Sequence, residues 1–254
     1  MTVRARWRAS SSEWVATRLL HPRAVALAAT LLAGPFAVTP VHAQLVGSVS
    51  VESDYRFRGY SLSDRRPAAV AQLGYDDPSG FYVNAAAIGV LGHDAEVYFL
   101  GAQGNIGYTK RLSPRLYVDG GVVHSEYDPV APDRDNWRYT DIYVGLGTDH
   151  FTGRISYSPH YFISDLSTLY AEAEATFEPA PKWSLTAHFG TLFYLSSPDF
   201  VRHETYYDWR IGAARSFGNF NVHTALWGGG PGADYYGSRP RDKTVVTVGA
   251  SFNF

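Results

Sequence analysis

Hydrophobic and polar residues alternate along almost all of the chain after residue 43. In the last segment, KTVVTVGASFNF at 243–254, the even-numbered positions are mostly apolar and end in aromatic rings, whereas the odd-numbered positions are mixed and end polar. Successive side chains of a β-strand point to opposite faces, so this pattern predicts a strand between two different media. The same period and the turn signals predict twelve strands, at 45–58, 67–75, 81–91, 96–108, 116–127, 137–147, 151–162, 168–177, 183–194, 205–216, 220–229 and 243–254.

The connections between these strands alternate in length. Short turns such as 76–80 and 217–219 follow the even-numbered strands, and most of the longer loops follow the odd-numbered ones. Tight turns at one end and long loops at the other are typical of an outer-membrane barrel. The predicted fold is therefore all-β: a transmembrane, antiparallel up-and-down β-barrel of about twelve strands. Ten or fourteen strands remain open, because sequence patterns place strand ends only to within a few residues.

The first 43 residues (1–43) are predicted to be a signal peptide. Five arginines precede an uncharged, Ala- and Leu-rich run at 24–38, and Val41-His42-Ala43 suits cleavage before Gln44. The alternative is a retained transmembrane helix, which the prolines in and after this run disfavour. Cleavage leaves 254 − 43 = 211 residues, 44–254, as one barrel domain in the outer membrane of a Gram-negative bacterium.

The amino-acid composition excludes several classes of function. The leader removes five of 22 basic and one of 24 acidic residues, so the mature chain carries a net charge of 17 − 23 = −6. No basic patch suggests nucleic acid, and the absence of cysteine excludes disulfides and thiolate chemistry. No phosphate-binding loop, close histidine pair or acidic calcium loop is present, so we expect no cofactor and no metal.

Charged residues share one face of several predicted strands. Four charges on one face are costly in a packed core and natural in a wet lumen. The residues predicted to line such a lumen are Glu52, Asp54, Arg56, Arg58, Glu172, Glu174, His188, Asp208, Arg210 and His223. Opposed charges would orient polar solutes and bias ion selectivity. The alternative is that these charges pair and fill the lumen.

These features predict a porin that lets small polar solutes or ions diffuse passively. A barrel with a filled lumen and a structural or adhesive role is the main alternative. A barrel hydrolase that uses His188 or His223, Ser184 or Ser251, and Asp208 is a weaker one, because no nucleophile motif is present. Expected partners are outer-membrane lipid and the barrel assembly machinery, which would read the last strand and its terminal Phe254. The tryptophans 137, 183, 209 and 227 are predicted to lie in the interfacial girdles.

Four short motifs resemble a known family. They are SDYRFRG at 53–59, with serines at 61 and 63 and Pro67 after it, SGFY at 79–82, DGGVV at 119–123 and YYDW at 206–209. In this order they resemble the TorF-type family of proteobacterial porins, and the resemblance covers essentially all of 44–254. The chain departs from the family where His124-Ser125-Glu126 replaces an expected Tyr-rich sequence. The resemblance implies a porin without catalytic residues.

Overall fold

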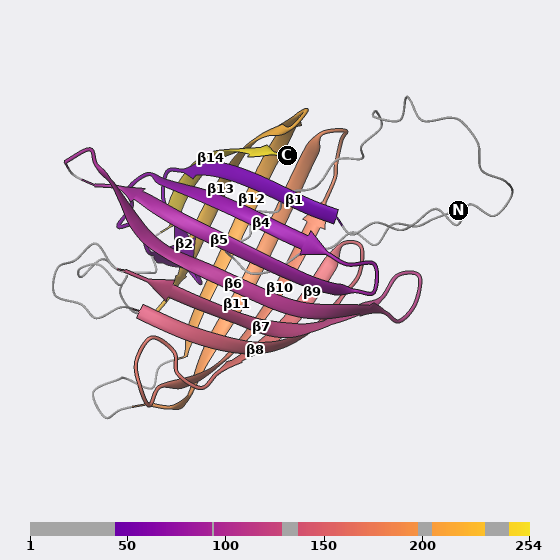
Figure 1. Cartoon of the computed structure of the whole chain (residues 1–254), viewed down its shortest axis with the longest axis horizontal. Helices are drawn as coiled ribbons and strands as arrows, with labels where there is room; N and C mark the ends of the chain where they lie inside the picture. Colours follow the sequence, from indigo (N-terminus) through magenta and orange to yellow (C-terminus); the bar gives the residue numbers. More distant parts are fainter. Residues whose placement is uncertain (1–43, 93, 129–136, 198–204, 232–243) are drawn as a thin grey trace, which may run out of the picture.

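The structure is a computed structural model, and it describes residues 44–92, 94–128, 137–197, 205–231 and 244–254. Twelve strands within these residues form one closed barrel (Figure 1). They are β1 (Gln44–Glu52), β4 (Ala68–Asp76), β5 (Phe81–Leu91), β6 (Val97–Arg111), β7 (Tyr117–Tyr127), β8 (Trp137–Gly147), β9 (Phe151–Ser158), β10 (Ser167–Phe177), β11 (Trp183–Ser196), β12 (Tyr206–Phe217), β13 (Phe220–Gly230) and β14 (Val245–Asn253). The predicted fold class and strand number are therefore confirmed. The predicted signal peptide lies outside the described residues.

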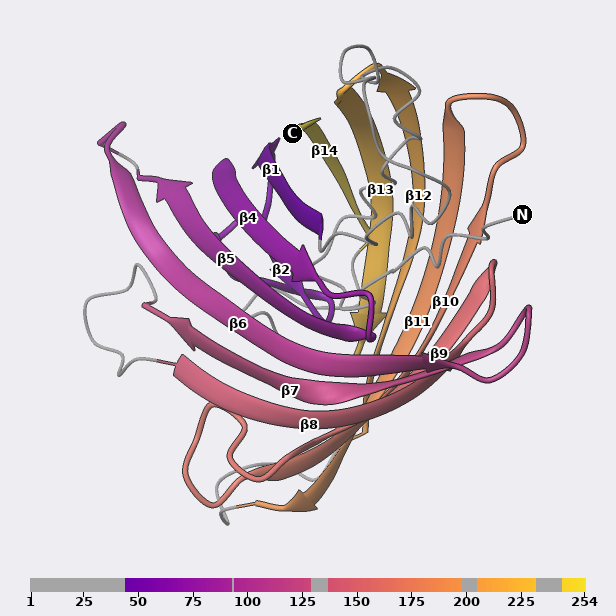
Figure 2. The ribbon, with the colours of Figure 1, turned by 45° about the vertical axis from the view of Figure 1, so that its right-hand side comes forward.

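The barrel closes where the first strand pairs with the last. From β4 to β14 each strand pairs antiparallel with the next, and β1 pairs with both β4 and β14. Past the end of β14, Gly47 and Phe254 exchange two backbone hydrogen bonds, with N···O distances of 3.0 and 2.9 Å. Figure 2 shows the curvature of the sheet that allows this closure. No strand of the closed ladder has an unpaired long edge.

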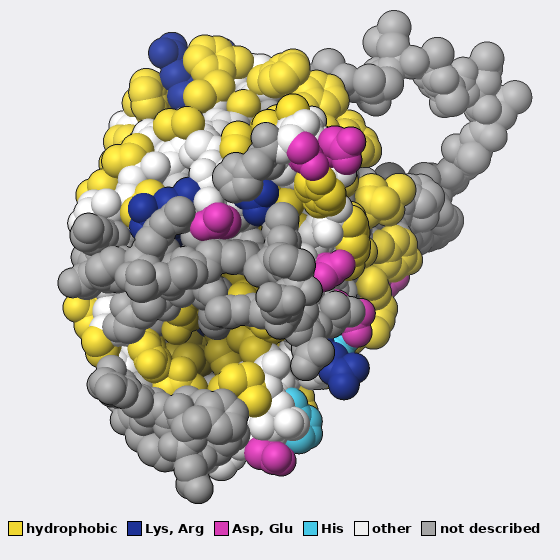
Figure 3. Space-filling view, turned by 90° about the vertical axis from the view of Figure 1, so that its left-hand side faces the viewer, with side chains coloured by type: hydrophobic (Ala, Val, Ile, Leu, Met, Phe, Trp, Pro, Cys, Tyr) yellow, Lys and Arg dark blue, Asp and Glu magenta, His cyan; other side chains and the backbone are white. Residues whose placement is uncertain are grey.

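The two faces of the wall differ as the alternation predicts. On β14, Val246 and Val248 point outward and are 64% and 55% exposed, whereas Thr247 and Ser251 point inward and are 6% and 5% exposed. In the view onto the end with the longer connections, hydrophobic side chains lie along much of the outline of the barrel (Figure 3). Among the described residues, no helix is long and apolar enough to cross a membrane.

The turn between β4 and β5 shows how the tight connections form. Gly80 adopts a φ of +104° and donates its N–H to the Asp77 carbonyl oxygen at 2.9 Å. Glycine tolerates this backbone conformation because it has no Cβ. Ser79 donates hydrogen bonds from its hydroxyl and its backbone N–H to the Asp77 carboxylate, which lowers the pKa of this carboxyl below its ordinary value.

The first predicted strand, 45–58, is too long. β1 ends at Glu52, and residues 53–66, here called the inward segment, turn into the barrel and carry the small hairpin of β2 (Arg56–Phe57) and β3 (Tyr60–Ser61) (Figures 1 and 2). Arg58 and Gly59 have φ values of +46° and +77°, which a continuous strand cannot accommodate. The alternation of charges continues through this turn, so the sequence pattern extended the strand too far.

The interior also contains a hydrophobic cluster. It is built from inward-facing wall residues and from residues of the inward segment and the β9–β10 connection: Tyr55, Phe57, Leu62, Ala68, Val70, Ala86, Ile88, Val90, Leu100, Tyr127, Tyr139, Tyr161, Leu166, Tyr170 and Leu192. Trp137 packs against this cluster, and Trp227 is buried and donates its Nε1–H to Thr247 Oγ1 at 2.8 Å. The girdle prediction is therefore wrong for these two tryptophans.

Candidate functional site

The inward segment is organised by one carboxylate. Asp54 accepts hydrogen bonds from the hydroxyls of Ser61 and Ser63 at 2.5 and 3.1 Å, and Arg56 Nη1 donates to it at 2.7 Å. The same guanidinium donates to the Gly59 carbonyl oxygen at 2.6 Å. Because these contacts lie within the segment and are buried, the segment holds its own shape inside the barrel.

Arg58 attaches this segment to the wall. Its Nη2 donates to Asp141 Oδ2 on β8 at 2.5 Å, across 83 positions of sequence. The guanidinium carbon lies 4.1 Å from the ring centroid of Tyr170 and 5.3 Å from that of Tyr161. Rings at these distances attract a cation, most strongly where water is excluded. Arg58 is therefore enclosed by aromatic rings with a carboxylate at its end.

A polar network lies on β10, β11 and β12. His188 Nε2 contacts Asp208 Oδ1 at 3.1 Å, and Tyr170 donates its hydroxyl to Asp208 Oδ2 at 2.9 Å. The other ring nitrogen, His188 Nδ1, lies 3.8 Å from Glu172 Oε2. Arg210 Nη2 donates to Glu174 Oε1 at 3.3 Å. Five of the ten predicted lumen residues thus lie in two adjacent groups on these three strands.

A second network on β5 to β9 contains charges that the sequence did not single out. Arg154 Nη2 donates to Asp119 Oδ2 at 2.9 Å, and its guanidinium lies 4.1 Å from the Tyr143 ring centroid. The Tyr82 hydroxyl donates to Asp119 at 2.6 Å and also contacts the Tyr143 hydroxyl. Asp119, Asp141 and Arg154 all occupy inward positions of their strands, so the two-residue period was the signal that could have found them.

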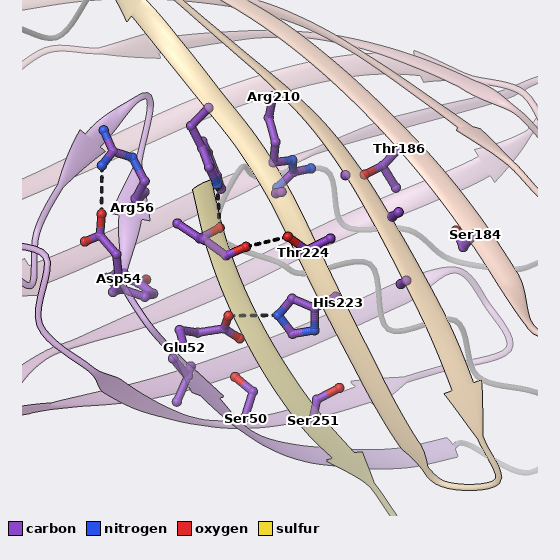
Figure 4. A pocket seen from close by; sticks show the side chains of 18 of the residues that line it. Ser50, Glu52, Asp54, Arg56, Ser184, Thr186, Arg210, His223, Thr224 and Ser251 are labelled. Atoms are coloured by element: carbon purple, nitrogen blue, oxygen red, sulfur yellow. Dashed lines mark hydrogen bonds and ion pairs between the residues drawn. The ribbon is translucent and has the colours of Figure 1, made fainter. Parts of the chain in front are cut away.

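A cavity of about 80 Å³ lies beside the inward segment (Figure 4). At its wall, His223 Nε2 and Glu52 Oε2 are 2.8 Å apart, which links β13 to the last residue of β1. The serine and threonine residues that line it are Ser48, Ser50, Ser184, Thr186, Thr224, Thr247 and Ser251. A cavity of this size is large enough for several water molecules.

The ten predicted lumen residues do not form a single site. Five of them, Glu52, Asp54, Arg56, Arg210 and His223, line the cavity. Arg58 belongs with Asp54 and Arg56 to the inward segment, and Glu172, Glu174, His188 and Asp208 lie with Arg210 on β10 to β12. Asp54, Arg56 and Arg58 come from the inward segment, where Arg56 begins the short strand β2, and not from a strand of the barrel wall, which corrects the predicted strand face. Every arginine of the interior named here, at 56, 58, 154 and 210, forms an ion pair with a carboxylate.

The residues considered for hydrolysis do not form a catalytic pair. Within the described residues, His188 and His223 hydrogen-bond to Tyr170, Asp208 and Glu52, and to no serine. Ser184 and Ser251 line the cavity with His223, without a hydrogen bond to it. The described residues also contain no group of three or more His, Asp or Glu that could hold a metal ion. The expected absence of catalysis stays a prediction.

Comparison with protein families gives one match. A family model described as a bacterial protein of unknown function, Gcw_chp, matches residues 37–252. The chain belongs to the Gcw_chp family. The match does not show the TorF-type assignment, which stays a resemblance. No curated protein matches this Gcw_chp sequence.

Solved porin structures resemble the Gcw_chp barrel. NanC porin has a TM-score of 0.52 at 10% identity and covers 82% of this chain and 99% of its own. KdgM porin has a TM-score of 0.49 at 11% identity with coverages of 82% and 99%. At such identities the likeness to NanC shows the fold alone: this Gcw_chp chain forms a porin-like β-barrel.

Gly190 tests how tightly the interior of this Gcw_chp barrel is packed. A Cβ at this position would overlap the Tyr170 ring and hydroxyl, which are buried and bonded to Asp208. We expect Gly190→Ala to lower the free energy of unfolding by roughly 1–3 kcal/mol, because Tyr170 must move. Urea unfolding of the barrel in detergent measures this change.

Gly104→Ala is the matched control for this prediction. It lies on β6, and a Cβ added there meets nothing within 4 Å. Because alanine restricts the unfolded chain and fills open space here, its effect should be small or slightly stabilising. Equal losses for the two variants would contradict the packing described around Tyr170.

Proposed function

We propose that the protein is an outer-membrane channel of the porin type, which passes small polar solutes or ions and is closed in this conformation by the inward segment. The observation that carries the proposal is the inward segment itself. It lies buried in the interior of a barrel whose wall carries charged and hydroxyl side chains, and Arg58 joins it to the opposite wall by an ion pair.

The outward face supports a membrane location. Large apolar side chains are exposed on every strand of the barrel wall, for example Val49 on β1, Ile142 on β8 and Ile211 on β12. Soluble monomers rarely expose contiguous apolar surface on this scale, whereas a transmembrane barrel needs it. Export by the predicted signal peptide and insertion through the assembly machinery, with Phe254 at the end of β14, complete the proposal.

The interior supports transport more than a purely structural role. The buried or largely buried interior groups named above include seven carboxylates, at 52, 54, 119, 141, 172, 174 and 208, and four arginines, at 56, 58, 154 and 210. Buried ion pairs stabilise a fold little compared with apolar packing of the same volume. A barrel that served only as a rigid body would be stabilised better by hydrophobic side chains.

One observation favours a second function. Many inward-facing side chains are almost completely buried, including Ser125, Asp208 and Leu100. A barrel filled in this way could act as a structural or adhesive protein without conducting. The two functions differ in what happens when the inward segment is removed.

Conductance measurements in planar bilayers distinguish the channel function from the structural or adhesive function. Residues 55–65 are replaced by a linker of about four Gly and Ser residues. A linker this short can connect β1 to β4, because Glu52 at the end of β1 already pairs with Ala68 at the start of β4. We expect the wild-type protein to conduct rarely and the shortened variant to give stable, ohmic steps, because the segment no longer fills the interior. Cation or anion preference follows from the reversal potential in a salt gradient.

If the shortened variant is folded and inserted but gives no conductance steps, the structural or adhesive function of a filled barrel would be favoured. Large, frequent steps from the wild-type protein would contradict closure by the inward segment. Glycine substitutions within the turn 113–115, which lies at the other end of the barrel, serve as a control for any loss of stability.

Val248 tests the lipid-facing assignment. Val248→Arg places a charge at the centre of β14 on its exposed face and should cost ~2–4 kcal/mol of folding free energy in lipid if the residue lies near the bilayer midplane. Reversible folding into lipid vesicles measures this cost.

Ser251→Arg is the comparison, since Ser251 faces the cavity that Glu52 also lines. Its cost should be smaller, because the new charge finds water and a carboxylate. Equal costs at the two positions would show that the two faces of β14 do not meet different media.

A further inference from the structure

Arg58 occupies a site that is built mainly by other parts of the chain. Its guanidinium carbon lies 4.1, 4.8, 5.3 and 5.7 Å from the ring centroids of Tyr170, Phe57, Tyr161 and Tyr139. Asp141 Oδ2 accepts a hydrogen bond from its Nη2. Three of the rings and the carboxylate belong to β8, β10 and the β9–β10 connection, and only Phe57 belongs to the inward segment.

The backbone of Arg58 is strained in order to reach this site. Its φ of +46° lies in the left-handed region, which a non-glycine residue enters only at an energetic cost. Such strain persists where surrounding contacts compensate for it, and it often marks a functional position. Here the compensating contacts are the ring faces and the carboxylate.

We propose that Tyr139, Tyr161, Tyr170 and Asp141 form a binding site for small cationic solutes that carry a guanidinium or alkylammonium group, and that Arg58 fills this site as a built-in ligand. The inference rests on the proposed function, since a solute reaches the site when the inward segment moves. A cationic solute and Arg58 then compete for the same rings and carboxylate.

The chemistry of the site selects cations. Aromatic faces attract cations and repel anions, and a buried carboxylate left without its arginine is strongly destabilised. Glu172 is close enough to interact electrostatically with Arg58, which adds to the negative potential. A planar guanidinium can stack on a ring and hydrogen-bond to Asp141 at once, as Arg58 does. A neutral solute of the same shape lacks the charge that both interactions need.

Chemical rescue tests the site without any need for conductance. The purified protein carrying Arg58→Ala is titrated with methylguanidinium, and its thermal unfolding is followed in detergent. We expect a saturable rise of the unfolding temperature, with a half-saturating concentration about tenfold lower than for the wild type, because binding to the folded state alone stabilises it. Methylurea, which has the same shape and no charge, should give no saturable rise.

Two variants define where the cation binds. Adding Asp141→Asn to Arg58→Ala should abolish the methylguanidinium response. Arg56→Ala removes a neighbouring arginine of the inward segment while Arg58 still fills the site, so it should respond no more than the wild type. A response to methylurea, or an undiminished response in the double variant, would overturn the proposal.

A second measurement uses the wild-type protein, in case Arg58→Ala does not fold. Leu62 donates its backbone N–H to the Tyr55 carbonyl oxygen within the inward segment. Methylguanidinium should speed hydrogen exchange at this amide at least several-fold more than equimolar methylurea, because it displaces Arg58 and loosens the segment. Equal exchange in both solutions would overturn the competition with Arg58.

The binding-site proposal and the channel proposal can be contradicted independently of each other. Specific binding of methylguanidinium in a protein whose shortened variant does not conduct would contradict the channel and leave the site intact. Conductance by the shortened variant without any specific binding would contradict the site and leave the channel intact.

Discussion

The closure of β1 on β14 is the constraint on which the rest of the structure depends. A closed ladder leaves no row of unpaired N–H and C=O groups along an open edge, which hydrocarbon would not tolerate. Closure also sends every second side chain of each strand into an enclosed interior. The outward residues can be simple and apolar, as Val246 and Val248 are, whereas the inward residues must pack, pair or hold water.

The interior meets this requirement in two different ways. Near the inward segment, tyrosines and leucines pack as a hydrophobic cluster, and further along the wall carboxylates pair with arginines, histidines and tyrosine hydroxyls. Each arginine of the interior discussed above lies beside a carboxylate, and three of them, at 58, 154 and 210, also lie over aromatic rings. Such combinations keep charge inside a narrow barrel at an acceptable desolvation cost.

The sequence could predict the wall and not what fills it. A period of two residues identifies strands and their faces without any knowledge of partners, which is why the strand number and the two faces of β14 agree with the structure. The same period does not report where the chain leaves the wall: Asp54, Arg56 and Arg58 keep the spacing of a strand face, although the chain turns inward after Glu52 and reverses at Arg58 and Gly59. The pairing of Arg58 with Asp141 joins residues 83 positions apart, and only the closed barrel brings them together.

The way the inward segment is anchored decides what could release it. A segment held only by apolar burial would resist every small polar solute, because none of them could replace the lost contacts. Tyr55, Phe57 and Leu62 of the inward segment do pack in the hydrophobic cluster, but Arg58 adds a charge, a planar donor and a stacking face, all of which a small guanidinium cation also carries. Asp54 meanwhile keeps the segment folded through contacts of its own, so the loss of one anchor need not unfold it. A self-structured segment with a replaceable ionic anchor is therefore suited to move as a unit, and under the proposed binding site the chemistry of that anchor would specify the class of solute that moves it.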